Sequence, residues 1–152
     1  MFRLCMRYAD SREVAEDLLQ EGFARVFKDL GQFRGEGALG AWIRQVFVRT
    51  ALTYLRKEQR RVTQISLSAE LPGSLNGESE VLGAMGAAEI MKLLQSLPPG
   101  YRAVFNLFAI EGYSHKEIGE LLHISERTSR SQYTRARALL ARLLSTIDRL
   151  SS

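Results

Sequence analysis

"SHKEIGELLHISERTSRSQYTRAR", residues 114–137, contains two amphipathic segments with four residues between them. Ser114 and Glu117 have the spacing of a capping box, in which each side chain bonds the backbone N–H of the other residue. A helix should therefore begin at this point. Residues 123–126 form the interruption, and Ser125 is suited to cap a second helix. The stretch predicts two helices joined by a short turn, with Gly119 leaving room for a close approach.

The second helix of this pair has two chemically different faces. Its inner face is a stripe with helical spacing, made of Ser129, Tyr133, Ala136, Leu140 and Leu143. A helix presented by a short turn can enter the DNA major groove, where arginine binds guanine and Ser or Thr contacts bases or phosphates. The alternative is an ordinary pair of helices with a solvated basic face. The candidate DNA-binding residues on the outer face are Arg127, Arg130, Ser131, Thr134 and Arg135.

Basic residues gather in two blocks of the chain. Residues 42–61 carry six Lys or Arg against one acid, and residues 127–142 carry five Arg and no acid. Residues 62–91, between them, have four Glu and no basic residue. Clustered Lys and Arg gain affinity for nucleic acids by displacing counterions from phosphates. The charge pattern therefore predicts two separate polyanion-binding surfaces.

The fold class expected from the whole sequence is all-α. Helical spacing of apolar residues covers residues 1–30, with Phe23, Val26, Phe27 and Leu30 in one stripe, and no stretch alternates with a period of two. Asp10-Ser11 interrupts this segment and can cap a new helix, with Glu13 three residues after Asp10 as in a capping box. Another helix is expected from about Ala41 to Arg61, with Gln45, Arg49, Thr53, Arg56 and Arg60 forming a polar, mostly basic stripe.

Two small helical domains joined by a flexible linker are expected. The segment around residues 63–84 is rich in Ser and Gly and contains Pro72, which is typical of a flexible linker. The expected domains are residues 1–62 and 85–152. Such a tether would let them occupy separate places on one partner.

Several functional classes find no support in the sequence. No apolar run reaches the roughly 18 residues of a membrane span, so no membrane insertion is expected. The single cysteine, Cys5, suits a reducing cytoplasm. GEGALG, residues 35–40, lacks the lysine of a phosphate-binding loop, and no nucleophile–base pair is recognisable. We therefore expect no catalysis, no cofactor and no metal, with His115 and His123 facing solvent or phosphate.

Four segments resemble a known family when they are taken in order. EDLLQEGFARVF (16–27), FRGEGALGAWI (33–43) and RTALTYLRKEQRR (49–61) resemble region 2 of bacterial extracytoplasmic-function (ECF) sigma factors. Residues 93–140, LLQSLPPGYRAVFNLFAIEGYSHKEIGELLHISERTSRSQYTRARALL, resemble their region 4. The resemblance implies a factor that binds core RNA polymerase, directs it to promoters and helps to melt them.

The resemblance also implies roles for individual residues. Asp17, Gln20 and Glu21 fall where the family docks on the clamp helices of the largest polymerase subunit. The loop residues Phe33, Arg34 and Glu36 fall where the family captures an unstacked base of the −10 element. Arg49, Thr53, Arg56 and Arg60 fall on the helix that reads −10, and the basic face of residues 127–135 falls where −35 is contacted. Further implications are an anti-sigma factor partner and a monomeric free chain.

Some positions depart from the family pattern. Arg49 stands where many members have Asn, Thr53 where they often have Asp, and Arg127 where a glycine is customary. The promoter sequence therefore cannot be copied from relatives. Met1 falls inside the first helix of the pattern, which indicates a truncated or reduced first helix. Two alternatives remain open: a stand-alone helix-turn-helix regulator that dimerises through residues 1–61, and an inactive sigma-like decoy.

Overall fold

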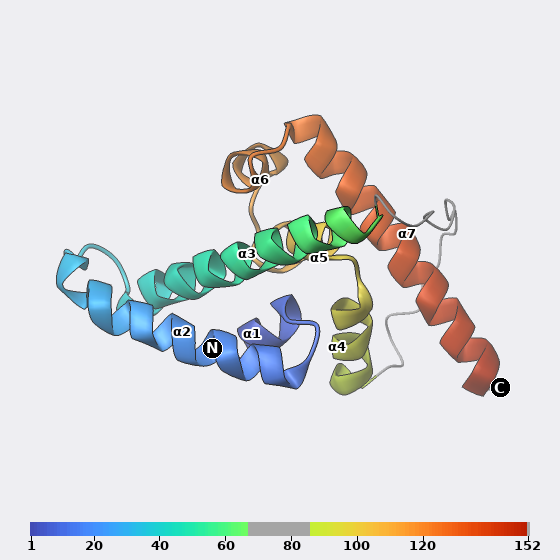
Figure 1. Ribbon diagram of the computed structural model, residues 1–152, viewed down its shortest axis with the longest axis horizontal. Helices are drawn as coiled ribbons and strands as arrows, with labels where there is room; N and C mark the ends of the chain where they lie inside the picture. The colour runs from blue at the N-terminus through green and yellow to red at the C-terminus, as the bar shows by residue number, and fades with distance from the viewer. Residues whose placement is uncertain (67–85, 152) are drawn as a thin grey trace.

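The computed structural model describes residues 1–66 and 86–151, with side chains for 1–61 and 86–150. All elements in these two ranges are helical, which confirms the all-α fold class (Figure 1). The N-terminal half contains α1 (Phe2–Tyr8), α2 (Arg12–Asp29), the 3-10 turn η1 (Leu30–Gln32) and α3 (Leu39–Ser66). The C-terminal half contains α4 (Ala87–Ser96), α5 (Pro99–Phe105), the π-helical turn η2 (Asn106–Ile110), α6 (His115–Leu122) and α7 (Glu126–Ser151).

Two helix boundaries differ from those expected. α2 is capped by Ser11, whose Oγ accepts a hydrogen bond from the Val14 N–H at 3.3 Å. Of the predicted pair Asp10-Ser11, Ser11 rather than Asp10 is the cap, because the extended backbone that an N-cap requires occurs at Ser11 (φ −148°, ψ 163°). α3 continues to Ser66 and thus extends into the segment expected to be linker. The remainder of that predicted linker, residues 67–85, lies outside the described residues.

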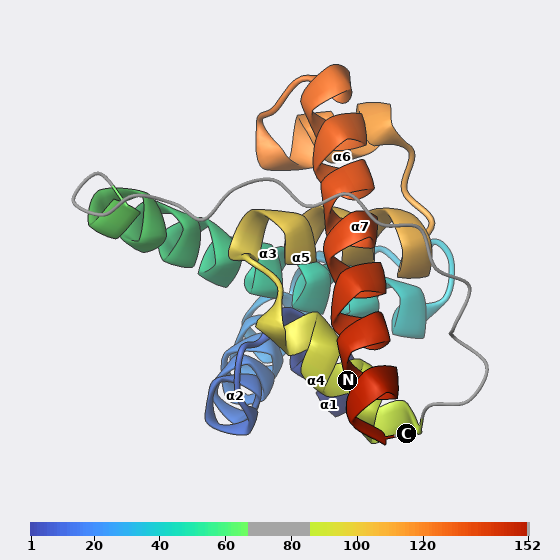
Figure 2. The same cartoon turned by 90° about the vertical axis from the view of Figure 1, so that its right-hand side faces the viewer.

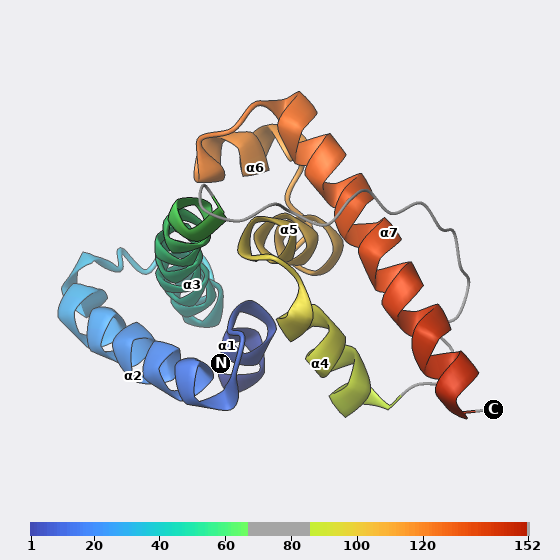
Figure 3. The same cartoon turned by 45° about the vertical axis from the view of Figure 1, so that its right-hand side comes forward.

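The two halves of the chain pack against each other. α1 contacts α2 and α3 in its own half and α4 and α5 in the other, and α5 lies between α3 and α7 (Figure 3). α7 packs along α5 and reaches α4 (Figure 2). One hydrophobic cluster joins the halves, with Leu52 and Leu55 of α3 in the same cluster as Val104 and Leu107. The described residues therefore form one body, although the sequence pattern indicates two tethered domains.

No helix in the described ranges combines the length and the apolar character that crossing a membrane requires.

Candidate nucleic-acid and polymerase interfaces

The helix-turn-helix predicted from residues 114–137 is present as α6, a short turn and α7. The Ser114 Oγ accepts from the Glu117 N–H at 3.1 Å, and the Glu117 carboxylate accepts from the Ser114 N–H at 2.7 Å. This confirms the capping box. The same backbone hydrogen bond holds the pKa of the Glu117 carboxyl below its usual value. α6 ends at Leu122, and its C-cap residue His123 has a left-handed backbone (φ 57°). The Ser125 Oγ accepts from the Thr128 N–H at 3.0 Å and caps α7.

Gly119 allows the turn to fold closely onto α6. A Cβ added at this buried glycine would lie 2.7 Å from the backbone oxygen of Ile124. The close approach predicted at Gly119 therefore occurs. The group that approaches the glycine is the backbone of the turn, at Ile124, and not the neighbouring helix. Because the turn orients α7, this glycine helps to set the direction in which the basic face points.

The basic face of α7 is open to solvent. All five predicted DNA-binding residues are exposed. Arg130 forms an ion pair with Glu126, but its side chain is 65% exposed, and a pair this open to solvent exchanges easily for a phosphate or a base. The Thr134 Oγ1 donates to the Arg130 backbone oxygen at 3.0 Å. The residues of this face are Arg127, Arg130, Ser131, Thr134 and Arg135.

His115 is half-buried and contacts the inner face of α7. Its ring stacks on Phe108 with centroids 4.2 Å apart, and its Nδ1 lies 2.9 Å from the Oγ of the buried Ser129. Burial and the nearby charge of Arg130 lower the pKa of His115. The expectation that His115 faces solvent or phosphate is wrong. The sequence predicts that Ser129 lies on the inner face of its helix. It does not predict that His115, fourteen residues earlier, contacts Ser129.

The basic stripe of α3 is exposed at Arg49, Arg56 and Arg60, but Thr53 has a different environment. Thr53 lines a pocket of about 140 Å³ between α2 and α3, together with Asp17 and Glu21. Its Oγ1 donates to the Arg49 backbone oxygen at 3.0 Å. The structure thus places Thr53, which is predicted to bind DNA, next to Asp17 and Glu21, which are predicted to bind polymerase.

The loop between α2 and α3 holds the three predicted base-capturing residues. Phe33 is half-buried and its ring packs on Trp42 with centroids 5.6 Å apart. Trp42 in turn packs against the hydrophobic core. Arg34 and Glu36 are exposed and alternate with glycines that have positive φ (Gly35 71°, Gly37 81°). The left-handed backbone at Gly35 and Gly37 favours glycine, because a side chain is strained in that conformation.

The exposed face of α2 is more apolar than its sequence indicates. Asp17, Gln20 and Glu21 are exposed as expected. The apolar stripe predicted from Phe23 to Leu30 buries only Val26, while Phe27 is 72% exposed. Phe23 on α2 and Leu30 at the start of η1 are also exposed, so an apolar patch follows the acidic and amide residues toward the end of α2. Patches of this kind mark interaction sites, and sequence reasoning missed this one because a buried and an exposed stripe have the same spacing.

Comparisons with known proteins agree with this geometry. The family model for sigma-70 region 2 matches residues 1–61, and the model for sigma-70 region 4 matches residues 87–140. The ECF RNA polymerase sigma-E factor of Escherichia coli (strain K12) is 31% identical over 144 residues, covering 88% of this chain and 75% of the relative. The RNA polymerase sigma-H factor of Pseudomonas aeruginosa is 27% identical over 151 residues, covering 93% of this chain and 78% of the relative.

A solved structure shares the fold. It is the co-crystal structure of the sigma factor RpoE in complex with the anti-sigma factor NepR from Bartonella quintana. The TM-score is 0.60 at 22% sequence identity, and the match covers 95% of this chain and 89% of that one. Together with the family models and the relatives, this shows that the chain belongs to the sigma-70 family as an ECF sigma factor with regions 2 and 4, a transcription initiation factor that directs RNA polymerase to promoters.

Proposed function

We propose that residues 1–62 act as the region that binds core RNA polymerase and the −10 element, and that residues 85–152 bind the −35 element. The observation that carries this proposal is the exposed arginine face of α7, held by a capped helix-turn-helix, together with a second exposed basic face on α3. Two such faces on one chain suit two separate contacts with DNA. A stand-alone helix-turn-helix regulator leaves the second face without a role.

The N-terminal part of α7 reads the −35 element in this proposal. Arg130 and Arg135 are exposed on the outer face and have guanidinium groups that can bind guanine through two hydrogen bonds. Ser131 and Thr134 lie between them and can contact bases or phosphates. Arg127, in the first turn of the helix, adds a charge near the DNA backbone.

Replacing Arg130 or Arg135 with alanine is expected to weaken binding to the −35 element by about 1–3 kcal/mol at the contacted base pair. The reason is the loss of a bidentate arginine–guanine contact. Promoter affinity of the reconstituted holoenzyme, measured against single base changes in −35, checks this. Arg149→Ala, at an exposed position near the end of α7, is the matched control. Equal losses for Arg149→Ala and the two test variants would contradict the assignment.

Core polymerase docks on the exposed face of α2 in this proposal. Asp17 and Glu21 supply carboxylates and Gln20 an amide, which suit a basic helical partner such as the clamp helices. Phe27 extends the same surface with an apolar side chain. The combination of an apolar anchor and neighbouring charged groups is typical of protein interfaces.

The Asp17→Ala substitution is expected to weaken binding to core polymerase, in the absence of DNA, by more than about 1 kcal/mol. Binding of free DNA should be unaffected, because Asp17 lies on α2 and not on a basic face. Titration of labelled chain with sigma-free core enzyme measures the effect. Glu16→Ala removes a neighbouring exposed carboxylate that pairs with Arg12, so it serves as the control. A DNA-binding defect in Asp17→Ala would overturn this division of labour.

The −10 element is captured by the α2–α3 loop and read by α3 in this proposal. Phe33 offers an aromatic face anchored on Trp42, and Arg34 and Glu36 lie beside it on the exposed turn. Holding a base outside the stack offsets the cost of unstacking it, so binding energy can help to open the duplex. Arg49, Arg56 and Arg60 then hold the DNA backbone or base edges, with Thr53 at the margin of this face.

An anti-sigma factor is a further partner in this proposal. The support is the solved structure with the same fold, in which a sigma factor is bound to an anti-sigma factor.

Reconstituted transcription tests the proposed function as a whole. The assay combines this chain, sigma-free core polymerase from its own host and a fragmented genomic library, and transcript starts are sequenced. Discrete starts that share −35 and −10 motifs are the expected result. Core binding without starts would favour the decoy, and neither starts nor core binding would favour the stand-alone regulator.

A further inference from the structure

The inner side of α7 makes a polar contact close to the start of the helix. Ser129 is fully buried there, and its Oγ lies 2.9 Å from the Nδ1 of His115, the first residue of α6. A hydroxyl both donates and accepts, so the two groups share a hydrogen bond with either tautomer of the ring. A buried hydroxyl needs a partner of this kind, because leaving it unpaired is unfavourable.

The ring of His115 is held in place by its neighbours. It stacks on Phe108 with centroids 4.2 Å apart and planes only 9° from parallel. The Tyr133 ring of α7 lies 5.8 Å from it, centroid to centroid. His115 also follows Ser114, whose capping box fixes the start of α6. The Nδ1 atom therefore offers Ser129 a partner in a defined direction.

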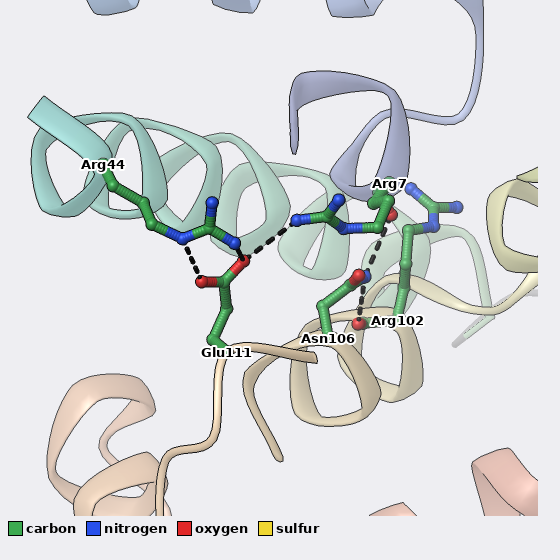
Figure 4. Close-up of polar contacts among 5 residues, drawn as sticks. All are labelled: Arg7, Arg44, Arg102, Asn106 and Glu111. Carbon is green, nitrogen blue, oxygen red and sulfur yellow. Dashed lines mark hydrogen bonds and ion pairs between the residues drawn. The ribbon is translucent and has the colours of Figure 1, made fainter. Parts of the chain in front are cut away.

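Phe108, the base of this stack, belongs to a turn that is itself fixed. It lies in η2, which begins at Asn106 and is followed by Glu111. The Asn106 side chain donates to the Arg102 backbone oxygen at 2.9 Å (Figure 4). The Glu111 carboxylate accepts from Arg44 Nε at 2.7 Å (Figure 4). Both ends of the turn are thus bonded, and the imidazole ring stacks on a well-supported side chain.

The hydrogen bond lies next to a residue proposed to read DNA. Arg130 follows Ser129 directly and is exposed on the outer face. Beyond Tyr133 the inner stripe of α7 is apolar, and apolar contacts have no preferred direction. A hydrogen bond, in contrast, weakens steeply when its angle departs from linear. The contact between His115 and Ser129 therefore restricts the rotation of α7 about its axis more than the apolar contacts do.

A small rotation of α7 is enough to change what Arg130 contacts. Side chains of a helix extend about 5–6 Å from its axis, so a rotation of about 10° moves their ends by about 1 Å. Binding sites work well only when their groups are held to within about 0.5 Å and 10–20°. A bidentate arginine–guanine contact, with two hydrogen bonds to one base, is especially sensitive to such a shift.

We propose that His115 is a positioning residue for −35 recognition, which fixes the rotation of α7 through its hydrogen bond to Ser129 and so determines the base pair that Arg130 favours. This inference rests on the proposed role of α7 in reading −35. His115 acts through Ser129 and does not itself contact a base. Its loss should therefore change base preference, whereas loss of folded protein or of a phosphate contact weakens binding to all sequences alike.

Two substitutions of His115 separate its hydrogen bond from its stacking. His115→Phe keeps an aromatic ring against Phe108 but offers Ser129 no partner. His115→Asn loses the ring but places an amide group where Nδ1 lies. Ser129→Ala removes the hydroxyl, and a double variant combines Ser129→Ala with His115→Phe. Thr146→Ala is the matched control, because it removes an exposed hydroxyl of α7 that donates to the Arg142 backbone oxygen at 3.1 Å.

The experiment measures base preference with the complete holoenzyme. Each full-length variant is assembled with core polymerase and bound to a promoter library in which only the −35 element varies, and the bound DNA is sequenced. We expect His115→Phe and Ser129→Ala each to lower the preference at one or two adjacent −35 positions about fivefold or more. The double variant should fall no further than either single variant, because both remove the same hydrogen bond. His115→Asn and Thr146→Ala should keep the wild-type pattern.

Three results would overturn the positioning role. One is a uniform loss of binding across the library with unchanged base preference, which is what a purely structural role predicts. Another is a double variant in which the two losses multiply, since the residues would then act independently. The third is His115→Asn behaving like His115→Phe, which would make the ring rather than the hydrogen bond responsible. A wild-type chain without any −35 preference would contradict the proposed function, and this inference with it.

Discussion

The Arg102→Met substitution is expected to lower the free energy of unfolding by about 3–5 kcal/mol, because several buried carbonyl groups lose their donor at once. Arg102 is 4% exposed, and its guanidinium donates to four backbone oxygens, those of Tyr8, Leu94, Gln95 and Leu97. Methionine fills much of the same volume but donates no hydrogen bond. Several buried carbonyl groups then lose their partners, at about 1–3 kcal/mol for each one left unsatisfied.

The environment of Arg102 explains why this position is sensitive. Burial lowers the pKa of the guanidinium, although the charges of Tyr54, Asp10 and Glu58 act in the opposite direction. The backbone oxygens at the ends of α1 and α4 provide its hydrogen-bond acceptors, so these carbonyl groups and the buried cation depend on each other. Loss of the arginine affects the end of α4, its turn to α5 and the junction with α1 together.

Urea unfolding followed by circular dichroism measures the effect on stability. Arg142→Met, at an exposed position of α7, is the matched control and should stay within about 0.5 kcal/mol of the wild type. A loss below about 1 kcal/mol for Arg102→Met would mean that water can replace the guanidinium, and the central structural role of Arg102 would be wrong.

The Gly119→Ala substitution is expected to lower stability by about 3 kcal/mol, at the upper end for an added methyl group in a packed site. The new Cβ would lie 2.7 Å from the Ile124 oxygen, a distance that requires movement of backbone. The turn carries Ser125, the cap of α7, so its displacement also turns the basic face. We therefore expect loss of −35 recognition together with loss of stability.

Gly40→Ala is the matched control for this prediction. Gly40 is a helical glycine in α3 with no heavy atom within 4 Å of an added Cβ, so the change should be neutral or slightly stabilising. Thermal unfolding of both variants and −35 binding by the reconstituted holoenzyme provide the comparison. Full −35 recognition in Gly119→Ala would show that the turn tolerates a Cβ, contrary to the geometry.

Much of the functional surface could be predicted from local sequence. The capping box at Ser114, the cap at Ser125 and the exposed face of Arg130 and Arg135 follow from spacings within a few residues. Local interactions of this kind need no information about the rest of the fold, because neighbours three or four residues apart always meet on a helix. The contact roles of these residues with DNA remain predictions.

Other features depend on contacts between distant parts of the chain. Phe27 and Val26 belong to one apolar segment, yet Phe27 is 72% exposed and Val26 5%. Which of them is covered depends on where α3 packs on α2. The aromatic support of His115 by Phe108, and its contact with Ser129, likewise arise only when η2, α6 and α7 are assembled.

The sequence by itself determined the all-α class, the helix-turn-helix, the two basic faces and the family, because each depends on helical periodicity, capping or ordered motifs. Only the tertiary structure decided that the two halves form one body, that Arg102 is buried against Tyr8, 94 residues away, and that Glu111 lies between Arg7 and Arg44. The physical reason is that a charged residue in a sequence looks the same whether it is solvated or buried. Burial and pairing are set by groups that only folding brings within reach.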